Sequence, residues 1–198
     1  METFIYGLLI ATSVVGLTFI VERGLALRWR RVVPPAIEAA VESCQTLSDV
    51  AMLRRVCEAN PSPISRLLLM ASDRLDWPKA DNVDALQTSA RHEISRLERG
   101  LVVLEVIVGI APLLGLVGTI YGMMSLFQGL GVTGISDATR LAQGIGLILH
   151  ATLLGLLIAI PSLVFWSFYS KRVEVLAVEM ERLCEEFVRR QYQQTERK

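Results

Sequence analysis

Three long runs without charged residues alternate with polar segments along the sequence. They extend from Phe4 to Val21, from Val106 to Ser136 and from Leu141 to Ser170. At about 1.5 Å of rise per helical residue, each run is long enough to cross a hydrocarbon layer of roughly 30 Å. We therefore predict an all-α membrane protein with transmembrane helices at 1–21, 101–128 and 137–170, the last two joined by a short periplasmic loop at 129–136.

The polar segments also carry helical patterns. Ser62 and Pro63 form a good helix start, as N-cap and first-turn proline, and Trp77-Pro78 is expected to end that helix. From Asp81 to Gly100, apolar residues recur at helical spacing without a helix breaker, which predicts one continuous helix into the second span. The pattern after the third span is likewise amphipathic. Regions 22–100 and 171–198 are thus predicted to be long helical extensions.

Basic residues predict the orientation in the membrane. Cytoplasmic flanks of transmembrane helices are enriched in lysine and arginine. Four arginines follow the first run, two precede the second, and a basic pair follows the third: Arg23, Arg28, Arg30, Arg31, Arg96, Arg99, Lys171 and Arg172. The N-terminus is therefore predicted outside and both polar regions in the cytoplasm. The first run lacks a basic leader and a cleavage site, so we expect a mature helix.

The composition narrows the choice of partners and chemistry. The 20 Lys and Arg residues balance the 20 Asp and Glu residues. No basic stripe remains beyond the membrane flanks, which argues against a nucleic-acid partner. Cys44, Cys57 and Cys184 lack C-x-x-C spacing and fall in predicted cytoplasmic segments, so we expect reduced thiols with a packing role and predict neither a metal site nor a cofactor.

Small residues and prolines distinguish the second and third runs from simple anchors. They recur three or four positions apart, a pattern that lets helix backbones approach closely. The stripes consist of Ala111, Gly115, Gly118 and Gly122 in the second run and Ala151, Gly155, Ala159 and Ser162 in the third. Pro112 and Pro161 should each free one backbone carbonyl and kink their helix.

Four polar side chains in or beside these runs are candidates for a proton path. Thr119 and Thr152 lie near the middle of their helices, where each hydroxyl either bonds a carbonyl of its own helix or lines a path for protons or water. His150 is the only ionisable residue within the third run; it is either a proton carrier or a neutral imidazole bonded to a neighbouring helix. Glu105, at the predicted cytoplasmic edge, is either a proton exit or an interfacial charge.

Two motif blocks resemble a known family. LERGL (97–101) is followed by APLLGLVGT (111–119) with Gly122, and the third run reads A-T-x-x-G-L-x-x-A-I-P (151–161). This combination of sequence motifs resembles the MotA/TolQ/ExbB proton-channel family. Three spans with the N-terminus outside place it closer to ExbB and TolQ than to MotA, which has four spans.

The resemblance implies an assembly and roles for individual residues. It implies a homopentamer whose second and third helices surround a central pore. Two single-span partner chains of the ExbD/TolR type, each with a membrane aspartate, would occupy that pore, and a TonB/TolA-like transducer would complete the complex. It assigns Thr119 and Thr152 to the family's pore threonines, and Pro112 and Pro161 to its recurrent prolines.

One position departs from the family pattern. ExbB and TolQ proteins usually carry a glutamate five positions before the third-span threonine, and here that position is Leu147. We hypothesise that His150, three residues later on nearly the same face, partly replaces it.

The predicted function is that of a proton-channel subunit of a bacterial inner-membrane motor that drives work at the outer membrane. A non-conducting oligomeric scaffold is the alternative. An enzyme is not expected, because H-E-x-x-H and G-x-S-x-G patterns are absent. The sequence chooses neither between TonB-dependent import and Tol-type envelope maintenance nor between protons and sodium.

Overall fold

The computed structural model describes residues 2–46, 49–133 and 138–195, and these form helices joined by short turns. Within those ranges there is no β-strand. Three helices are long and apolar enough to cross a membrane, at Thr3–Ala26, Leu101–Gln128 and within Gly144–Gln193. The predictions of an all-α chain and of three membrane spans are confirmed.

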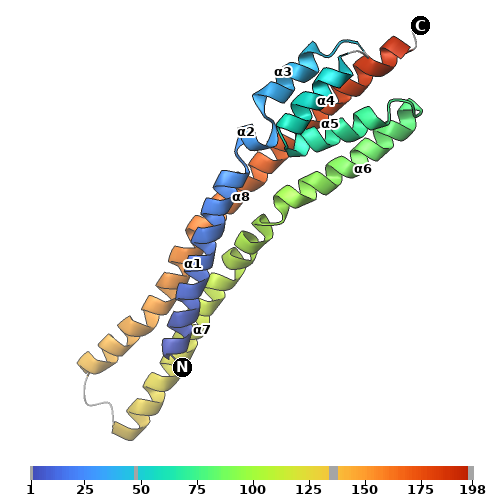
Figure 1. Cartoon of the computed structure of the whole chain (residues 1–198). Coiled ribbons are helices and arrows are strands. Elements are labelled where there is room, and N and C mark those ends of the chain that lie inside the picture. The colour runs from blue at the N-terminus through green and yellow to red at the C-terminus, as the bar shows by residue number, and fades with distance from the viewer. Residues whose placement is uncertain (1, 47–48, 134–137, 196–198) are drawn as a thin grey trace. The chain divides into compact units, whose positions relative to one another are not determined.

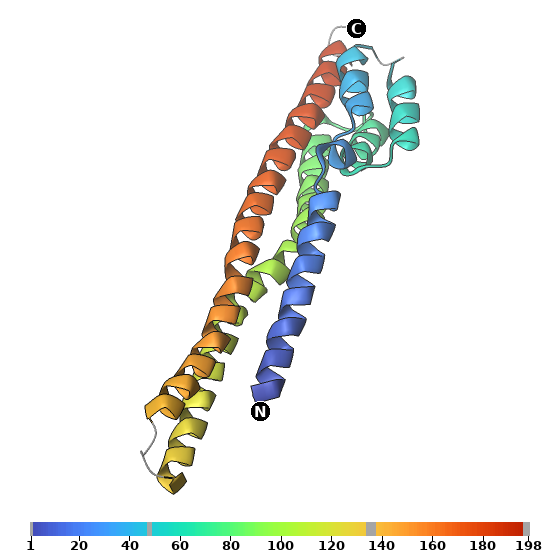
Figure 2. The ribbon, with the colours of Figure 1, turned by 90° about the vertical axis from the view of Figure 1, so that its left-hand side faces the viewer.

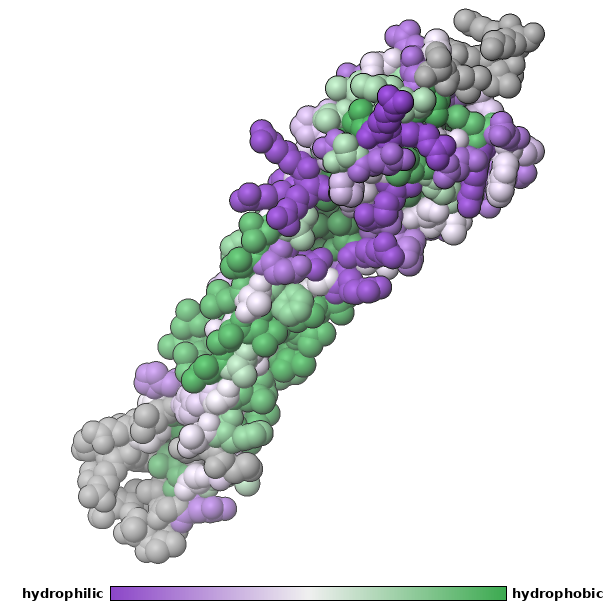
Figure 3. All heavy atoms as spheres, viewed as in Figure 1, coloured by the Kyte–Doolittle hydropathy of each residue, from purple (hydrophilic) through white to green (hydrophobic). Residues whose placement is uncertain are grey.

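The helices, labelled in Figure 1, divide between two compact units. We call residues 1–23 and 100–168 the membrane unit, and residues 24–99 and 169–198 the polar unit. In Figure 3 apolar side chains cover the visible face of the membrane unit, and hydrophilic side chains cover much of the polar unit. The helices are α1 (Glu2–Ala26), α2 (Trp29–Val32), α3 (Pro35–Ser43), α4 (Val50–Ala59), α5 (Pro63–Asp73), α6 (Lys79–Glu98), α7 (Leu101–Thr133) and α8 (Ala138–Thr195).

In the membrane unit, α1 packs beside the hairpin formed by α7 and the first part of α8 (Figures 1 and 2). A Cβ placed on Gly16 of α1 would lie 3.5 Å from Ile107 of α7 and 3.5 Å from Ser162 of α8. Further along, Ile5 lies beside Gly118, so α1 and α7 run in opposite directions. The large apolar side chains on the outside of this unit are widely exposed, as expected for helices that face lipid.

The helix ends differ from the predicted boundaries around the outer loop. α7 continues to Thr133, five residues beyond its predicted end at 128. This stretch contains two glycines but no proline, so every residue keeps the N–H that a helix needs. Residues 134–137, including the Ser136 and Asp137 expected to cap the third span, lie outside the described residues. α8 begins at Ala138 and continues as one helix to Thr195.

The predicted continuous helix across Gly100 is wrong, because α6 ends at Glu98 and α7 begins at Leu101. Glycine weakens a helix. It also leaves room here for the side chain of Arg23, which occupies the space that a Cβ on Gly100 would need. Arg23 pairs with Glu22 on the same helix, with an Nε–Oε2 distance of 2.5 Å.

The core of the polar unit is built from α3 to α6 and the last part of α8. Large aliphatic side chains fill it, with Phe187 fully buried: Ile37, Leu53, Ile64, Leu67, Leu68, Leu176 and Leu183. The predicted start of α5 is confirmed, because the Ser62 hydroxyl accepts a hydrogen bond from the Ser65 amide at 3.2 Å. The helix ends at Asp73, four residues before Trp77.

Candidate functional site

Glycines set the close contact between α7 and α8 in the membrane unit. A Cβ on Gly155 would lie 2.5 Å from the carbonyl oxygen of Ala111, and one on Gly115 would lie 2.8 Å from that of Ala151. Real Cβ atoms essentially never approach so closely, so neither position admits a side chain without moving a helix backbone. Small residues therefore allow the two helices to touch through their main chains.

Two more glycines continue this contact toward the outer end of the hairpin. A Cβ on Gly118 would lie 2.7 Å from the Ala151 methyl group, and one on Gly122 would lie 2.6 Å from the Ile148 side chain. Residues further along α7 thus contact residues earlier in α8, as expected for antiparallel helices. Thr119 lies between Gly118 and Gly122, and His150 between Ile148 and Ala151, so Thr119 and His150 lie at the same depth.

The two threonine hydroxyls have different hydrogen-bond partners. Thr119 Oγ1 donates to the Leu116 carbonyl of its own helix at 2.7 Å. Thr152 Oγ1 donates across the hairpin to the Gly115 carbonyl at 3.3 Å. The Thr119 hydroxyl thus bonds a carbonyl of its own helix, which was one of the two predicted possibilities. The Thr152 hydroxyl instead bonds a carbonyl of the other helix, which the sequence did not indicate. Each hydroxyl oxygen keeps lone pairs that can accept a proton or a hydrogen bond.

His150 bonds to its own helix rather than to a neighbouring one. Its Nδ1 lies 2.8 Å from the Gly146 carbonyl oxygen, and the imidazole is exposed on the surface of the chain. A carbonyl can only accept, so Nδ1 is the donor in this contact, and Nε2 is an acceptor only when the ring is neutral. The side chain of Leu147, at the position where the resemblance leads us to expect a glutamate, lies outside the described residues.

The prolines and Glu105 occupy the remaining predicted positions. Pro112 and Pro161 lie inside α7 and α8, which both continue through them. A proline has no N–H to donate, so the carbonyl one turn before each lacks its usual helical partner. Glu105 is exposed on the first turns of α7 and forms no ion pair with the described residues. The predicted kinks and the predicted proton exit stay predictions.

A cavity of about 320 Å³ lies beside the same hairpin. It is bounded by Ile5 and Tyr6 of α1, by Gly118 and Gly122 of α7, and by Ile148 of α8. Neither threonine lines it, and nor does His150. The candidate proton-path side chains thus lie outside this cavity.

The cysteines of the polar unit are buried free thiols. Cys44 and Cys57 are 2% and 1% exposed, and Cys184 is also buried. Burial raises the pKa of Cys57 to about 11, so it is a thiol at neutral pH. Within the described ranges, no three His, Cys, Asp or Glu side chains gather as metal ligands do.

Some polar contacts of the polar unit were not predicted from the sequence. Glu93 of α6 is 6% exposed and accepts two hydrogen bonds from the Arg66 guanidinium of α5. Asn82, fully buried, donates to the Tyr192 hydroxyl at 3.1 Å, and that hydroxyl also lies 2.9 Å from the Trp77 carbonyl oxygen. Asn82 and Glu93 are each next in sequence to an apolar residue of α6, Val83 and Ile94. This position beside the apolar face is the sequence signal that could have predicted their burial.

Together these features define a multi-pass membrane protein that contains a two-helix hairpin with direct backbone contact and a separately packed polar unit. The model of the MotA/TolQ/ExbB proton channel family matches residues 61–182, which is more than half of the chain. The chain belongs to this family, and the resemblance stated from the motifs is confirmed.

Several curated proteins are similar to the chain. A putative biopolymer transport protein ExbB-like 1 of Synechocystis is 35% identical over 78% of this chain and 62% of its own length. The ExbB protein of Helicobacter pylori is 36% identical over 52% of this chain and 67% of its own length. The Tol-Pal system protein TolQ of Pseudomonas aeruginosa is 28% identical over 90% of this chain and 82% of its own length.

Proposed function

We propose that the chain is the proton-channel subunit of a bacterial inner-membrane motor, which uses the proton motive force to drive work at the outer membrane. The observation that supports the proposal is the close α7–α8 hairpin. It occurs in a chain that belongs to the proton-channel family. Its backbones touch at Gly115 and Gly155, and it holds Thr119 and His150 at one depth. One proton crossing a potential of about 100 mV releases roughly 2.3 kcal/mol.

The proposed assembly follows the resemblance to ExbB and TolQ. Five copies would surround a pore, with the N-terminus outside and the polar unit in the cytoplasm. Two ExbD/TolR-like single-span chains would supply the membrane aspartate, and a TonB/TolA-like transducer would carry force outward. The hairpin offers hydroxyls and an imidazole but no membrane carboxylate, so the chain alone should conduct poorly. The transported ion is the proton, without a cofactor and without enzymatic chemistry.

In this proposal the hairpin side chains pass protons to and from the partner's aspartate. The Thr152 hydroxyl, held by the Gly115 carbonyl, has a fixed position on the hairpin. The His150 imidazole, whose Nδ1 faces the Gly146 carbonyl, would accept a proton on Nε2 from its neutral form at the depth of Thr119. His150 thereby takes part of the role of the glutamate that Leu147 replaces. Glu105 would release protons to the cytoplasm.

The first experiment measures native mass, in detergent, of the chain alone and co-expressed with its single-span partner. Five subunits, plus two partner chains on co-expression, are the expected result. A different stoichiometry with no partner bound would favour the alternative, a non-conducting scaffold in which the small-residue contacts serve oligomerisation only.

The second experiment measures proton flux and motor-dependent growth of side-chain variants. Thr119→Val and Thr152→Val should each reduce coupled activity by at least about tenfold, which corresponds to the loss of one useful hydrogen bond in the path. Thr18→Val is the matched control, because Thr18 of α1 also donates to a carbonyl of its own helix, that of Val14 at 2.8 Å. Full activity of His150→Leu would show that the imidazole does not replace the glutamate. Sodium-dependent flux that does not vary with pH would contradict a proton channel.

A further inference from the structure

Three arginines follow the first membrane-crossing helix at once. Arg28 stands just after the end of α1, and Arg30 and Arg31 belong to α2 (Figure 1). We call these three residues the arginine cluster. Residues 24–37 contain no aspartate or glutamate, so the cluster has no acidic neighbour in its own segment. The chain thus gathers positive charge of one sign where it leaves the span Thr3–Ala26.

Buried residues on either side hold the cluster in place. Leu27 precedes it and Val32 and Val33 follow it, and all three are buried in the polar unit. Within the short helix, the Arg31 amide donates to the Arg28 carbonyl at 2.9 Å. The side chains of the cluster are all exposed. A fixed frame of buried residues therefore presents three guanidinium groups to the surroundings.

The acidic residues nearest to the cluster in sequence have other partners. Before it, Glu22 pairs with Arg23, with an Nε–Oε2 distance of 2.5 Å. After it, Glu38 lies 3.8 Å from the Arg182 guanidinium. Within the part of the chain that the structure describes, no guanidinium of the cluster forms an ion pair. The cluster is therefore not neutralised by the described residues of its own chain.

The adjoining part of α8 adds to this positive charge. Arg172 donates from Nε to the Leu27 carbonyl at 2.9 Å, which brings a fourth guanidinium beside the cluster. Glu174, the acid that follows it on α8, is paired with Lys171 at 2.8 Å. Like charges that lie close together repel one another, so an anionic partner would stabilise this surface.

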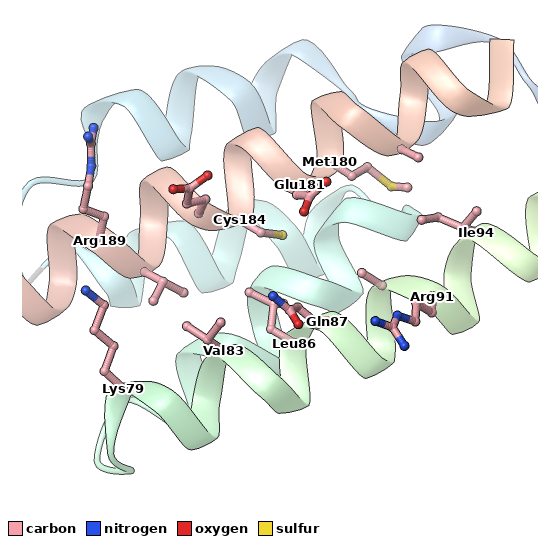
Figure 4. A pocket seen from close by; sticks show the side chains of 14 residues that line it. Lys79, Val83, Leu86, Gln87, Arg91, Ile94, Met180, Glu181, Cys184 and Arg189 are labelled. Atoms are coloured by element: carbon pink, nitrogen blue, oxygen red, sulfur yellow. The ribbon is translucent and has the colours of Figure 1, made fainter. Parts of the chain in front are cut away.

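Exposed charges in another part of the polar unit are mixed in sign. A groove of about 680 Å³ between α6 and the last part of α8 is bordered by Arg91 and Arg189 and also by Glu181 and Glu185 (Figure 4). Cations and anions on one surface largely cancel at a distance, so such a surface attracts an anionic partner weakly. The arginine cluster differs because its charge is of one sign.

We propose that the arginine cluster binds the phosphate groups of anionic phospholipids in the adjacent membrane leaflet. Chain connectivity places it at headgroup height, because Arg28 follows a membrane-crossing helix by two residues. A guanidinium group donates paired N–H groups to phosphate oxygens, and anionic membrane surfaces attract basic segments beside a span. Trp29, inside the cluster, is of the residue type that is enriched at this depth.

The exposure of the cluster favours a lipid over a free anion. None of its three residues lines the α6–α8 groove or the cavity beside the hairpin, so no enclosed pocket surrounds their guanidinium groups. A bilayer holds many phosphate groups at one height and can contact all three arginines together, whereas a small free anion would contact fewer. The proposal requires only that α1 crosses the membrane, so it does not depend on proton conduction or on a ring of subunits.

Thermal unfolding of the full chain in neutral detergent tests the proposal. Phosphatidylglycerol, which is anionic, or phosphatidylcholine, which has no net charge, is added in increasing mole fraction. A ligand that binds the folded state raises the unfolding temperature. For the triple variant Arg28→Gln, Arg30→Gln, Arg31→Gln, the half-maximal effect should require at least about tenfold more phosphatidylglycerol than for the wild type, because three charge contacts are lost.

The matched control removes the same charge elsewhere in the polar unit. The triple variant Arg55→Gln, Arg91→Gln, Arg189→Gln changes three exposed arginines that lie outside the cluster. Its response to phosphatidylglycerol should stay within about twofold of the wild type, because its cluster is intact. An equal loss in the two triple variants would show that only net charge matters and would overturn the proposal.

A second variant covers the case in which the glutamine triple variant does not fold. Arginines beside a span also orient the chain during insertion, and lysines preserve that signal. The triple variant Arg28→Lys, Arg30→Lys, Arg31→Lys keeps the positive charge but loses the paired N–H donors. It should keep a preference for phosphatidylglycerol over phosphatidylcholine, with a half-maximal fraction about threefold higher than that of the wild type. Loss of all preference, or no change at all, would contradict binding through guanidinium–phosphate contacts at this surface.

The remaining outcomes separate the lipid from other anions. Equal stabilisation of the wild type by the two lipids would overturn the proposal. Inorganic phosphate that stabilises the wild type as strongly as phosphatidylglycerol, at equal concentration and without lipid, would assign the cluster to a free anion instead. Stabilisation by polyglutamate but not by phosphatidylglycerol would assign it to an acidic protein segment. Either result would overturn the assignment to phospholipid and leave the proposed channel function untouched.

Discussion

The membrane unit and the polar unit use opposite means to hold helices together. In the membrane unit, Gly115 and Gly155 bring two backbones into contact, and the large apolar side chains point outward. In the polar unit, large side chains such as Leu183 and Phe187 fill the space between helices. Lipid is as apolar as leucine, so helices in a membrane gain little from burying leucine, whereas helices in water gain a great deal.

The same contrast extends to polar groups. In the membrane unit, the described threonine hydroxyls at positions 12, 18, 119 and 152 donate to backbone carbonyls, as Thr12 does within α1 and Thr152 does across the hairpin. In the polar unit, charged side chains pair with one another, and Arg190 of α8 donates to the carbonyls of Val41 and Glu42 at the end of α3. Each unit thus satisfies its polar groups with the partners that its surroundings provide.

The largest expected effect is on the side-chain core. Phe187→Ala should destabilise the polar unit by about 3–5 kcal/mol, because it leaves a cavity at a fully buried position. Thermal unfolding of the detergent-purified protein measures this loss. Met52→Ala, at an exposed position of α4, is the control and should change stability by less than about 0.5 kcal/mol. Equal unfolding temperatures for the two variants would show that the polar unit does not depend on a packed core.

The next effect is on the backbone contact of the hairpin. Gly155→Ala should cost about 1–3 kcal/mol, because the added methyl group meets the Ala111 carbonyl and a helix must move. A Cβ on Gly146 would have no neighbour within 4 Å, so Gly146→Ala provides the matched control. Native mass and thermal stability in detergent report the change. If both variants behave like the wild type, α7 and α8 can move apart without loss of stability. The membrane unit would then not depend on backbone contact, contrary to the comparison drawn above.

The ion pair between Arg66 and Glu93 gives a pH-dependent effect. The Arg66 guanidinium holds the pKa of Glu93 below its usual range. A carboxyl group with a lowered pKa stabilises the folded state above its ordinary pKa, which is 4.5 for Glu93, and this contribution is lost as the pH falls through the lowered pKa. Glu93→Gln should therefore cost about 2 kcal/mol at pH 7 and much less near pH 3. Thermal unfolding at both pH values tests this, and a pH-independent difference would contradict it.

The smallest effect concerns a hydrogen bond of the polar unit. Tyr192→Phe removes the hydroxyl that accepts from Asn82 and lies 2.9 Å from the Trp77 carbonyl oxygen, and should cost about 1 kcal/mol. Tyr121→Phe on α7 is the control, because within the described residues the Tyr121 hydroxyl has no hydrogen-bond partner. Chemical or thermal unfolding compares the two. A larger loss for Tyr121→Phe would reverse the expected order.

The sequence by itself determined the number of spans, the helical class and the family. These depend on local properties: the length of charge-free runs, the capping pair Ser62 and Pro63, and the motif around Ala111 to Thr119. It also placed the small residues of α7 on one face, because helical periodicity fixes which side chains align. Their exact partners, such as the Ala111 carbonyl opposite Gly155, depend on the register between two helices, which no local pattern contains.

Only the tertiary structure decided the contacts between distant segments. The sequence predicted an unbroken helix at Gly100, but Arg23, 77 positions earlier, occupies the space beside that glycine. It likewise gave no sign that Thr152 bonds to Gly115 rather than to its own helix, or that α6 and α8 enclose a groove. Such features arise because the energy of a contact depends on which surfaces meet in space. The hydropathy of a segment indicates whether the segment is buried, but it does not indicate which other segment buries it.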